Sequence, residues 1–449
     1  MRGDAVSVEN VRARNNRIAF DSDRANRGAS PASALNADAL IEEACRRTGL
    51  TDFGDADFEG PLRRLLQVAH EEADLSRFGR LATRWDVVRF LSNLLRLRYE
   101  ETRTPAILDL PIEKPIFITG LPRSGTTFLA HLLAEDHANL LPRVWQVIFP
   151  YQRLNARLPG DWRAESVKWQ LRMFGLLAPK FARLHRIGPF SPQECSEITA
   201  HVFASLRFDT TYFIPSYRRW LDAAGHLEPY QFHKRFLQHL QFQAMRGTRW
   251  VLKCPDHVFA LSAIKAVYPD ARVVFVHRDP LRVLLSLSEL TEVLRRPFTR
   301  HIDRCRIGPH ESDRWLEATE LMIEADEQQP FAEPICHIHY RSLVEDPLGS
   351  VAMIYRHFGI TLDANAAARI RSVAQSKPDG GYRTHVYRFA DHGLDPALER
   401  SRYAKYSAHF GIPPEDQAED QAEDQAASTR AKGLSSASPF ARKRLTRSA

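Results

Sequence analysis

Residues 116–136, IFITGLPRSGTTFLAHLLAED, carry the strongest chemical signal in the chain. A short apolar run ends at Gly120, and a turn that contains Gly125 leads into a segment with apolar residues at helical spacing. The backbone N–H groups of such a turn and of the following helix point at one spot, and glycines let a ligand approach the backbone closely. This unit predicts a cradle for a phosphate-type anion.

The two glycines have the spacing of the nucleoside-triphosphate loop G-x-x-x-x-G-K-[ST], but Thr126 stands where that motif has its lysine. Arg123 lies inside the turn, and a guanidinium can bind an anion through two hydrogen bonds. Arg123 with nearby hydroxyl groups suits a phosphosulfate or monophosphate better than a magnesium-bound triphosphate. Two other functions that such a loop allows are a P-loop nucleotide kinase or NTPase and a non-catalytic nucleotide-binding protein.

A second run at 273–290, VVFVHRDPLRVLLSLSEL, predicts a strand that leads into a helix. Asp279 and Pro280 are typical of the N-cap and of the first helical position. Arg278 therefore follows the carboxyl end of the strand, and Ser286 lies about two turns into the helix. These two side chains could hold a second phosphate.

Together the two motifs resemble the sulfotransferases that use 3′-phosphoadenosine 5′-phosphosulfate (PAPS). LPRSGTTFL is similar to their 5′-phosphosulfate loop, and Arg278 with Ser286, eight residues later, is similar to their 3′-phosphate site. The runs RSGTT, RWVLKCP, HRDP and YRSLVEDP resemble the bacterial branch near the tyrosylprotein sulfotransferases. The resemblance covers roughly residues 113–405.

The resemblance implies a transferase that moves a sulfuryl group from PAPS to an acceptor hydroxyl in one in-line step, without a metal. Arg278 and Ser286 would bind the 3′-phosphate, and Tyr340 would contact adenine. Lys253 would neutralise charge on the bridging oxygen as the S–O bond breaks. The residues that would hold the 5′-phosphosulfate are Arg123, which would also act in catalysis, Ser124, Gly125, Thr126 and Thr127.

The acceptor must lose a proton, so a base is expected beside it. Cytosolic family members place a histidine two residues after the strand-end lysine, where this chain has Pro255. The tyrosylprotein branch uses a glutamate in a region where this chain reads VWQ, at 144–146. Neither family pattern therefore identifies the catalytic base in this chain.

Glu194 is our candidate for the base, because SPQEC, at 191–195, resembles a Pro-x-Glu-Cys element of the bacterial branch. The same residues also fit a helix capping box, in which Ser191 is the N-cap and Glu194 reaches back to its backbone. Both interpretations stay open. Glu197 and His257 are the other candidate bases.

Short apolar runs separated by helix-sized intervals predict an α/β fold with a P-loop-like central parallel sheet flanked by helices. The four expected strands are at 116–119, 250–253, 271–277 and 334–340. About 130 residues separate the first two strands, too many for one crossover helix, and helical patterns at 166–185, 193–206 and 230–245 fill them. We expect this insertion to cap the carboxyl edge of the sheet, where ligands bind in open α/β sheets.

The composition changes along the chain and predicts four regions. They are a disordered arm at 1–33, a helical lead-in at 34–110, a sulfotransferase domain at 111–410 with its cap insertion at about 145–247, and a disordered low-complexity tail at 411–449.

The 449 residues are 44% hydrophobic with a formal charge of +7, which is ordinary for a globular enzyme and does not indicate a nucleic-acid partner. Five scattered cysteines without Cys/His clusters predict no metal site and a reduced, cytoplasmic chain. No run of about 18 apolar residues occurs, so no transmembrane segment is expected. The expected partner is a small-molecule, glycan or lipid hydroxyl acceptor; the sequence predicts no oligomeric state.

Overall fold

A computed structural model describes residues 35–152, 162–177, 187–244, 247, 249–375 and 388–415. The expected disordered arm at 1–33 lies outside these residues, as does the tail from residue 416 onward. All five cysteines are free thiols. In the part of the chain that the structure describes, no helix is both long and apolar enough to cross a membrane.

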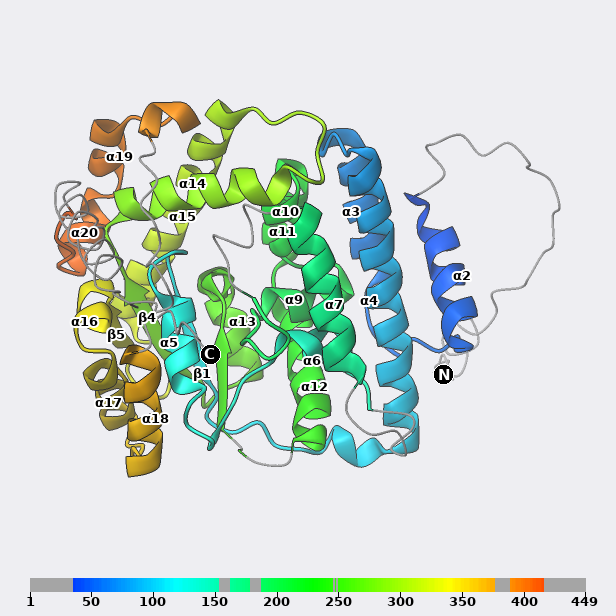
Figure 1. Ribbon diagram of the computed structural model, residues 1–449, viewed down its shortest axis with the longest axis horizontal. Helices are drawn as coiled ribbons and strands as arrows, with labels where there is room; N and C mark the ends of the chain where they lie inside the picture. The colour runs from blue at the N-terminus through cyan, green and yellow to red at the C-terminus, as the bar shows by residue number, and fades with distance from the viewer. Residues whose placement is uncertain are drawn as a thin grey trace, which may run out of the picture.

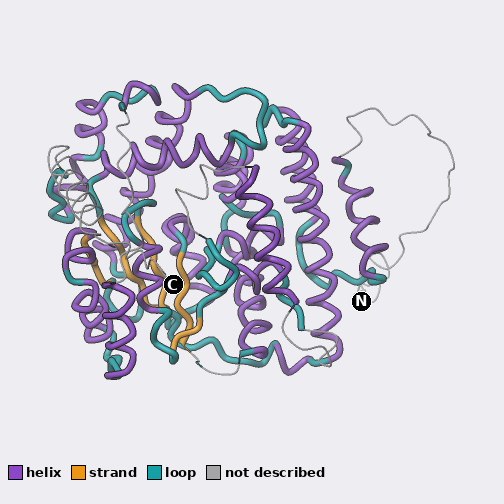
Figure 2. The backbone as a smooth tube through the Cα atoms, viewed as in Figure 1, coloured by secondary structure: helices purple, strands orange, loops and turns teal. Residues whose placement is uncertain are grey.

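Among the described residues, five parallel strands form a central sheet in the order β2-β3-β1-β4-β5 (Figures 1 and 2). The strands are β1 (Ile116–Gly120), β2 (Asn139–Leu140), β3 (Arg249–Lys253), β4 (Arg272–His277) and β5 (Cys336–His339). The predicted α/β fold with a helix-flanked parallel sheet is confirmed. The short strand β2 was not predicted, because two residues give no periodic signal.

Alternate side chains of the strands divide the core into two layers. Ile116 and Ile118 face one layer, and Phe117 between them faces the other, as the two-residue period of a strand requires. The first layer contains α5 (Thr126–Leu133), α16 (Tyr340–Glu345), α17 (Pro347–His357) and α18 (Ala364–Gln375). Both faces of the sheet are therefore covered, which explains why its central strands are apolar throughout.

The second layer is the larger helical body in Figure 1. Its N-terminal helices are α2 (Ala37–Thr48), α3 (Glu59–Glu72) and α4 (Arg77–Arg103), followed by the 3-10 turn η2 (Pro105–Ile107). Its later members are α13 (Leu261–Val267), α14 (Pro280–Arg295) and α15 (Arg304–Gln328), with the turn η4 (Pro255–Ala260) after β3. The last described elements are η5 (Phe389–His392), α19 (Pro396–Arg402) and α20 (Ala404–His409).

Between β2 and β3 the structure describes several helices rather than one crossover helix. They are α6 (Val144–Ile148), α7 (Trp162–Leu177), α9 (Ser196–Thr199), η3 (Ala200–Val202), α10 (Arg207–Thr211), α11 (Pro215–Ala224) and α12 (Leu227–Gln243). The helix expected over 193–206 is wrong in its extent. It begins only at Ser196 and ends at Phe203, whose φ of 55° is left-handed and cannot continue a helix.

Residues 411–415 fall in the range expected to be a disordered tail, yet they pack against the folded chain. Ile412 is buried in the larger core cluster, and Glu415 pairs with Arg278. The boundary expected at 411 is therefore too early.

Candidate active site

The loop between β1 and α5 has a backbone that its two glycines make possible. Gly120 and Gly125 have φ angles of 134° and 93°, and a Cβ on Gly120 would lie 2.3 Å from the Val276 carbonyl oxygen. Gly125 is also the N-cap of α5, so the open N–H groups of that helix face the loop. Arg123 is itself left-handed, with φ of 63°. Such strain in a non-glycine residue is typical of functional loops.

Ser124 differs from the expectation in the direction of its hydroxyl. The side chain is fully buried, and its Oγ donates to the Leu121 carbonyl oxygen at 2.6 Å. The hydroxyl therefore shapes the loop from inside, and the group that Ser124 can offer an anion is its backbone N–H.

Arg278 and Ser286 meet the same loop. The Arg278 guanidinium donates to the Arg123 carbonyl oxygen at 3.0 Å, and Arg123 Nε donates to Ser286 Oγ at 3.0 Å. The Arg278 guanidinium also lies 3.8 Å from the centre of the Tyr340 ring. Because β4 pairs with β1 in parallel, the segments after both strands come together at the carboxyl edge of the sheet.

An acidic side chain of the chain itself occupies this place. Arg278 Nε and Nη2 lie 3.1 Å and 2.8 Å from the two carboxylate oxygens of Glu415, and Arg282 Nε lies 4.0 Å from one of them. This fork is the geometry in which a guanidinium also binds phosphate. The residues present therefore fit a phosphate group.

Lys253, at the carboxyl end of β3, lies on the other side of β1. Its side chain is 3% exposed, and its Nζ donates to Glu194 Oε1 at 2.6 Å and to Thr127 Oγ1 at 3.2 Å. A buried ammonium requires such partners, because an unpaired charge away from water is very costly. The structure thus joins Lys253 to the loop and to the insertion at one point.

The capping-box interpretation of Glu194 is wrong. The Ser191 N–H donates to the Gly188 carbonyl oxygen at 3.1 Å, and α9 begins only at Ser196. The carboxylate of Glu194 instead pairs with Lys253, and its side chain is 36% exposed.

The two other candidate bases lie elsewhere. Glu197 forms an ion pair with Arg207. His257 is fully buried, its Nδ1 bonds the Tyr230 hydroxyl, and burial holds the pKa of His257 well below its usual range. A buried neutral histidine packed in this way is a core residue.

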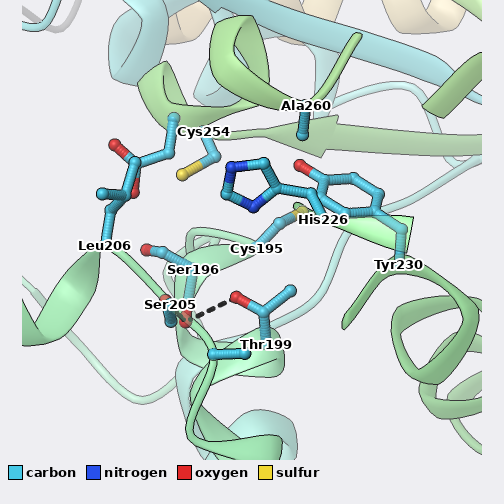
Figure 3. A pocket seen from close by; sticks show the side chains of 11 residues that line it. Cys195, Ser196, Thr199, Ser205, Leu206, His226, Tyr230, Cys254 and Ala260 are labelled. Atoms are coloured by element: carbon cyan, nitrogen blue, oxygen red, sulfur yellow. Dashed lines mark hydrogen bonds between the residues drawn. The ribbon is translucent and has the colours of Figure 1, made fainter. Parts of the chain in front are cut away.

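A small pocket adjoins the Lys253–Glu194 pair through their chain neighbours Cys254 and Cys195 (Figure 3). Figure 3 shows Cys254, His226 and Tyr230 along one side and Ser196, Thr199 and Ser205 along the other.

Asp256 also lines this pocket and was missed by the sequence analysis. Burial, and then the negative charge of Glu194, raise the pKa of its carboxyl from 3.8 to about 7. Its position three residues after Lys253, in the turn that follows a strand, is the signal that could have found it.

Within the described ranges, no group of three or more His, Cys, Asp or Glu side chains is placed to hold a metal ion. His131 bonds the Thr127 carbonyl oxygen within α5 through its Nδ1, at 2.8 Å, whereas Glu135, four residues later, lies beyond the end of that helix.

Comparison with known proteins identifies relatives of one kind. A sequence profile of the sulfotransferase family matches residues 115–364. The omega-hydroxy-beta-dihydromenaquinone-9 sulfotransferase of Mycobacterium bovis is 25% identical over 293 residues, which is 61% of this chain and 70% of that protein.

Two solved structures share both fold and sequence with this chain. Sulfotransferase STF9 from Mycobacterium avium has a TM-score of 0.77 and 26% identity, over 85% of this chain and 98% of that one. Sulfotransferase STF1 from Mycobacterium tuberculosis has a TM-score of 0.72 and 30% identity, over 82% of this chain and 98% of that one.

Proposed function

The chain belongs to the sulfotransferase family, and we propose that it transfers a sulfuryl group from PAPS to the hydroxyl of an apolar acceptor. One observation carries the proposal: the β1 loop, the Arg278 site and the Lys253–Glu194 pair meet at one edge of the sheet. The kinase alternative lacks support, since Thr126 stands in place of the lysine and the matched family is a sulfotransferase family.

In this proposal the donor nucleotide is held at both of its charged ends. Arg123, Thr126, Thr127 and the backbone N–H groups of Ser124 and Gly125 hold the 5′-phosphosulfate. At the other end, Arg278 and Ser286 hold the 3′-phosphate and Tyr340 contacts the adenine. Arg123 links the two ends, because it belongs to the loop and its Nε bonds Ser286. A nucleotide with both groups gains from both sites at once.

Lys253 and Glu194 do the chemistry on the acceptor side. The acceptor oxygen forms a bond to sulfur while the bond between sulfur and the bridging oxygen breaks, which releases 3′,5′-bisphosphoadenosine. Glu194 takes the acceptor proton, and Lys253 stabilises the negative charge that grows on the bridging oxygen. The 2.6 Å contact between Nζ and Oε1 holds the Lys253 and Glu194 side chains together at the point where the reacting groups would meet.

Exposed apolar side chains on α7 support a lipid-like alcohol as the acceptor. Helix α7 exposes Trp162, Trp169, Met173 and Leu176, which recur at helical spacing along one face. It packs on α6, whose first N–H groups bond the segment that leads to Glu194. The exposed residues thus lie on a helix that is joined through α6 to the segment before the proposed base. The Mycobacterium bovis relative is named for a menaquinone substrate with an omega-hydroxyl.

The test is a transfer assay with labelled PAPS on Glu194→Gln, with Glu197→Gln as the matched control. A base contributes about 10²–10⁴-fold, so we expect kcat to fall by that factor in Glu194→Gln while affinity for 3′,5′-bisphosphoadenosine stays within a few-fold. Glu197→Gln should keep most of its activity. Near-normal turnover of Glu194→Gln would remove its role as the base. Nucleotide binding without transfer to any alcohol would favour the non-catalytic alternative.

A further inference from the structure

The chain places one of its own carboxylates in the site that Proposed function assigns to the 3′-phosphate. We propose that residues 404–415 act as an intramolecular competitor, which seats Glu415 on Arg278 and must release it before the nucleotide can bind fully. The inference rests on the proposed function, because it takes Arg278 as the 3′-phosphate subsite.

Glu415 is bound as an anionic ligand would be bound. Both its carboxylate oxygens face the Arg278 guanidinium, with contacts at 3.1, 3.2 and 2.8 Å. Its backbone N–H donates to Asp279 Oδ2 at 2.8 Å. Arg282 Nε lies 4.0 Å from one of these oxygens, and burial, then the adjacent Arg278 charge, lowers the pKa of Arg282. Two cations this close need an anion between them, and a carboxylate or a phosphate supplies it.

The segment that brings Glu415 there is anchored by specific contacts. The Tyr406 hydroxyl bonds His277 Nδ1 at 3.0 Å, and the Phe410 ring stacks on the same imidazole at 4.3 Å. Ile412 is buried, and its N–H donates to the Ser407 carbonyl oxygen at 2.8 Å. Because His277 immediately precedes Arg278 at the end of β4, these contacts hold the segment beside the site.

The contact with Glu415 can open without loss of that anchor. The side chains of Arg278 and Glu415 are 17% and 30% exposed, whereas Tyr406 and Ile412 are buried. A partly exposed ion pair is weak by itself. Only two residues separate Glu415 from the buried Ile412, so this short tether gives Glu415 a high effective concentration at Arg278. Only chains in which Glu415 has left the site can bind the nucleotide fully. The apparent affinity therefore falls in proportion to the fraction of such chains.

The sequence after this point offers a matched control. Glu415 begins the first of three Glu-Asp-Gln-Ala repeats, and Glu419 begins the second. Glu415→Gln removes the charge that faces Arg278, and Glu419→Gln removes the same charge from the next repeat. The two variants have equal net charge, so a general electrostatic effect changes both equally.

The experiment is calorimetry of the full chain, of Glu415→Gln and of Glu419→Gln with two nucleotides. For 3′,5′-bisphosphoadenosine we expect Glu415→Gln to bind about three- to tenfold more tightly than the unsubstituted chain, and Glu419→Gln to bind equally. For adenosine 5′-phosphate, which lacks the 3′-phosphate, all three chains should bind alike. The result isolates competition at the 3′-phosphate subsite.

Other outcomes separate this inference from the function on which it rests. Equal affinity of Glu415→Gln and the unsubstituted chain for 3′,5′-bisphosphoadenosine would overturn the competitor role. An equal gain in Glu419→Gln, or a gain for both nucleotides, would overturn it too. If no chain bound either nucleotide, the proposed function itself would fail.

Discussion

Two cation–carboxylate pairs stand on either side of β1, and they differ in how their acidic members are held. Lys253 at the end of β3 pairs with Glu194, and Arg278 after β4 pairs with Glu415. The backbone on both sides of Glu194 is bonded, from Gln193 N–H to the Pro142 carbonyl oxygen at 2.7 Å and from Cys195 N–H to the Lys253 carbonyl oxygen at 3.3 Å.

Glu415 has a backbone bond from its own N–H to Asp279 Oδ2, and its side chain, at 30% exposed, is about as accessible as that of Glu194 at 36%. The same kind of ion pair can therefore be a fixed part of a site or a replaceable occupant of it. The difference lies in the backbone that carries the carboxylate. We infer that the first pair works during transfer and that the second gives way to substrate.

The largest effect should come from the fixed pair. Lys253→Met removes the cation that stabilises the developing charge, so we expect kcat to fall by about 10²–10³-fold. Affinity for 3′,5′-bisphosphoadenosine should change by less than about fivefold, since the charge that Lys253 serves develops during the reaction. Transfer assays and calorimetry measure the two quantities. Lys265→Met, exposed on α13, is the control, and a kcat within threefold of normal for Lys253→Met would show that the pair is structural.

Side chains on the nucleotide side should affect binding more than turnover. Arg123→Ala removes a guanidinium from the loop and from Ser286, so affinity for 3′,5′-bisphosphoadenosine should fall by about 10- to 100-fold. Ser286→Ala should weaken it less, by about three- to tenfold, because it removes one hydroxyl and no charge. Calorimetry in the presence of a chelator measures both. Unchanged affinity in both variants would contradict the proposal that the loop and the second anion site hold the same nucleotide.

A smaller effect should separate the acceptor side from the nucleotide side. Trp169→Ser and Leu176→Ser each remove apolar surface from α7, so KM for a long-chain isoprenoid alcohol should rise by about three- to tenfold. KM for PAPS should not change. Leu398→Ser, which removes an exposed leucine from α19, is the matched control. An equal rise for PAPS, or no rise for the alcohol, would remove α7 from the acceptor surface.

The smallest effect concerns stability near the fixed pair. In the folded chain Asp256 has a pKa of about 7, so between about pH 4 and 7 it keeps a proton that the unfolded chain has lost. Stability therefore falls as the pH rises through that window. Asp256→Asn should remove this dependence and raise the Tm by about 2–4 °C at pH 8, with little change at pH 4. Thermal unfolding at both pH values measures it, and an equal shift at both would assign the effect to packing.

Local sequence patterns predicted most of the fold. The apolar strands, the glycines at 120 and 125 and the Asp-Pro helix start are short-range signals, and the structure contains each of them. Arg278 and Ser286 were placed together because Arg278 follows the strand and Ser286 lies about two turns into the helix that begins two residues later. The pairing of β1 with β4 comes from the structure, and it brings the loop to Arg278 because parallel strands of such a sheet end at one edge.

Local patterns could not predict the ion pairs of the site, because each pair joins two segments that are distant along the chain. Glu194 and Lys253 are 59 residues apart, so the sequence could not exclude the capping box that local spacing also allowed. Glu415 lies 137 residues from Arg278, in a repeat whose composition is typical of disorder. The inward hydroxyl of Ser124 depends on a single rotamer, which spacing does not predict.

The most direct test of the account compares two nucleotides on two chains. Affinities for 3′,5′-bisphosphoadenosine and adenosine 5′-phosphate are measured by calorimetry on the unsubstituted chain and on Arg278→Gln. We predict that the unsubstituted chain prefers the bisphosphate by at least about tenfold, and that Arg278→Gln loses this preference while it binds adenosine 5′-phosphate as before. A preference that survives in Arg278→Gln would contradict the claim that Arg278 binds the 3′-phosphate of a nucleotide seated in the β1 loop.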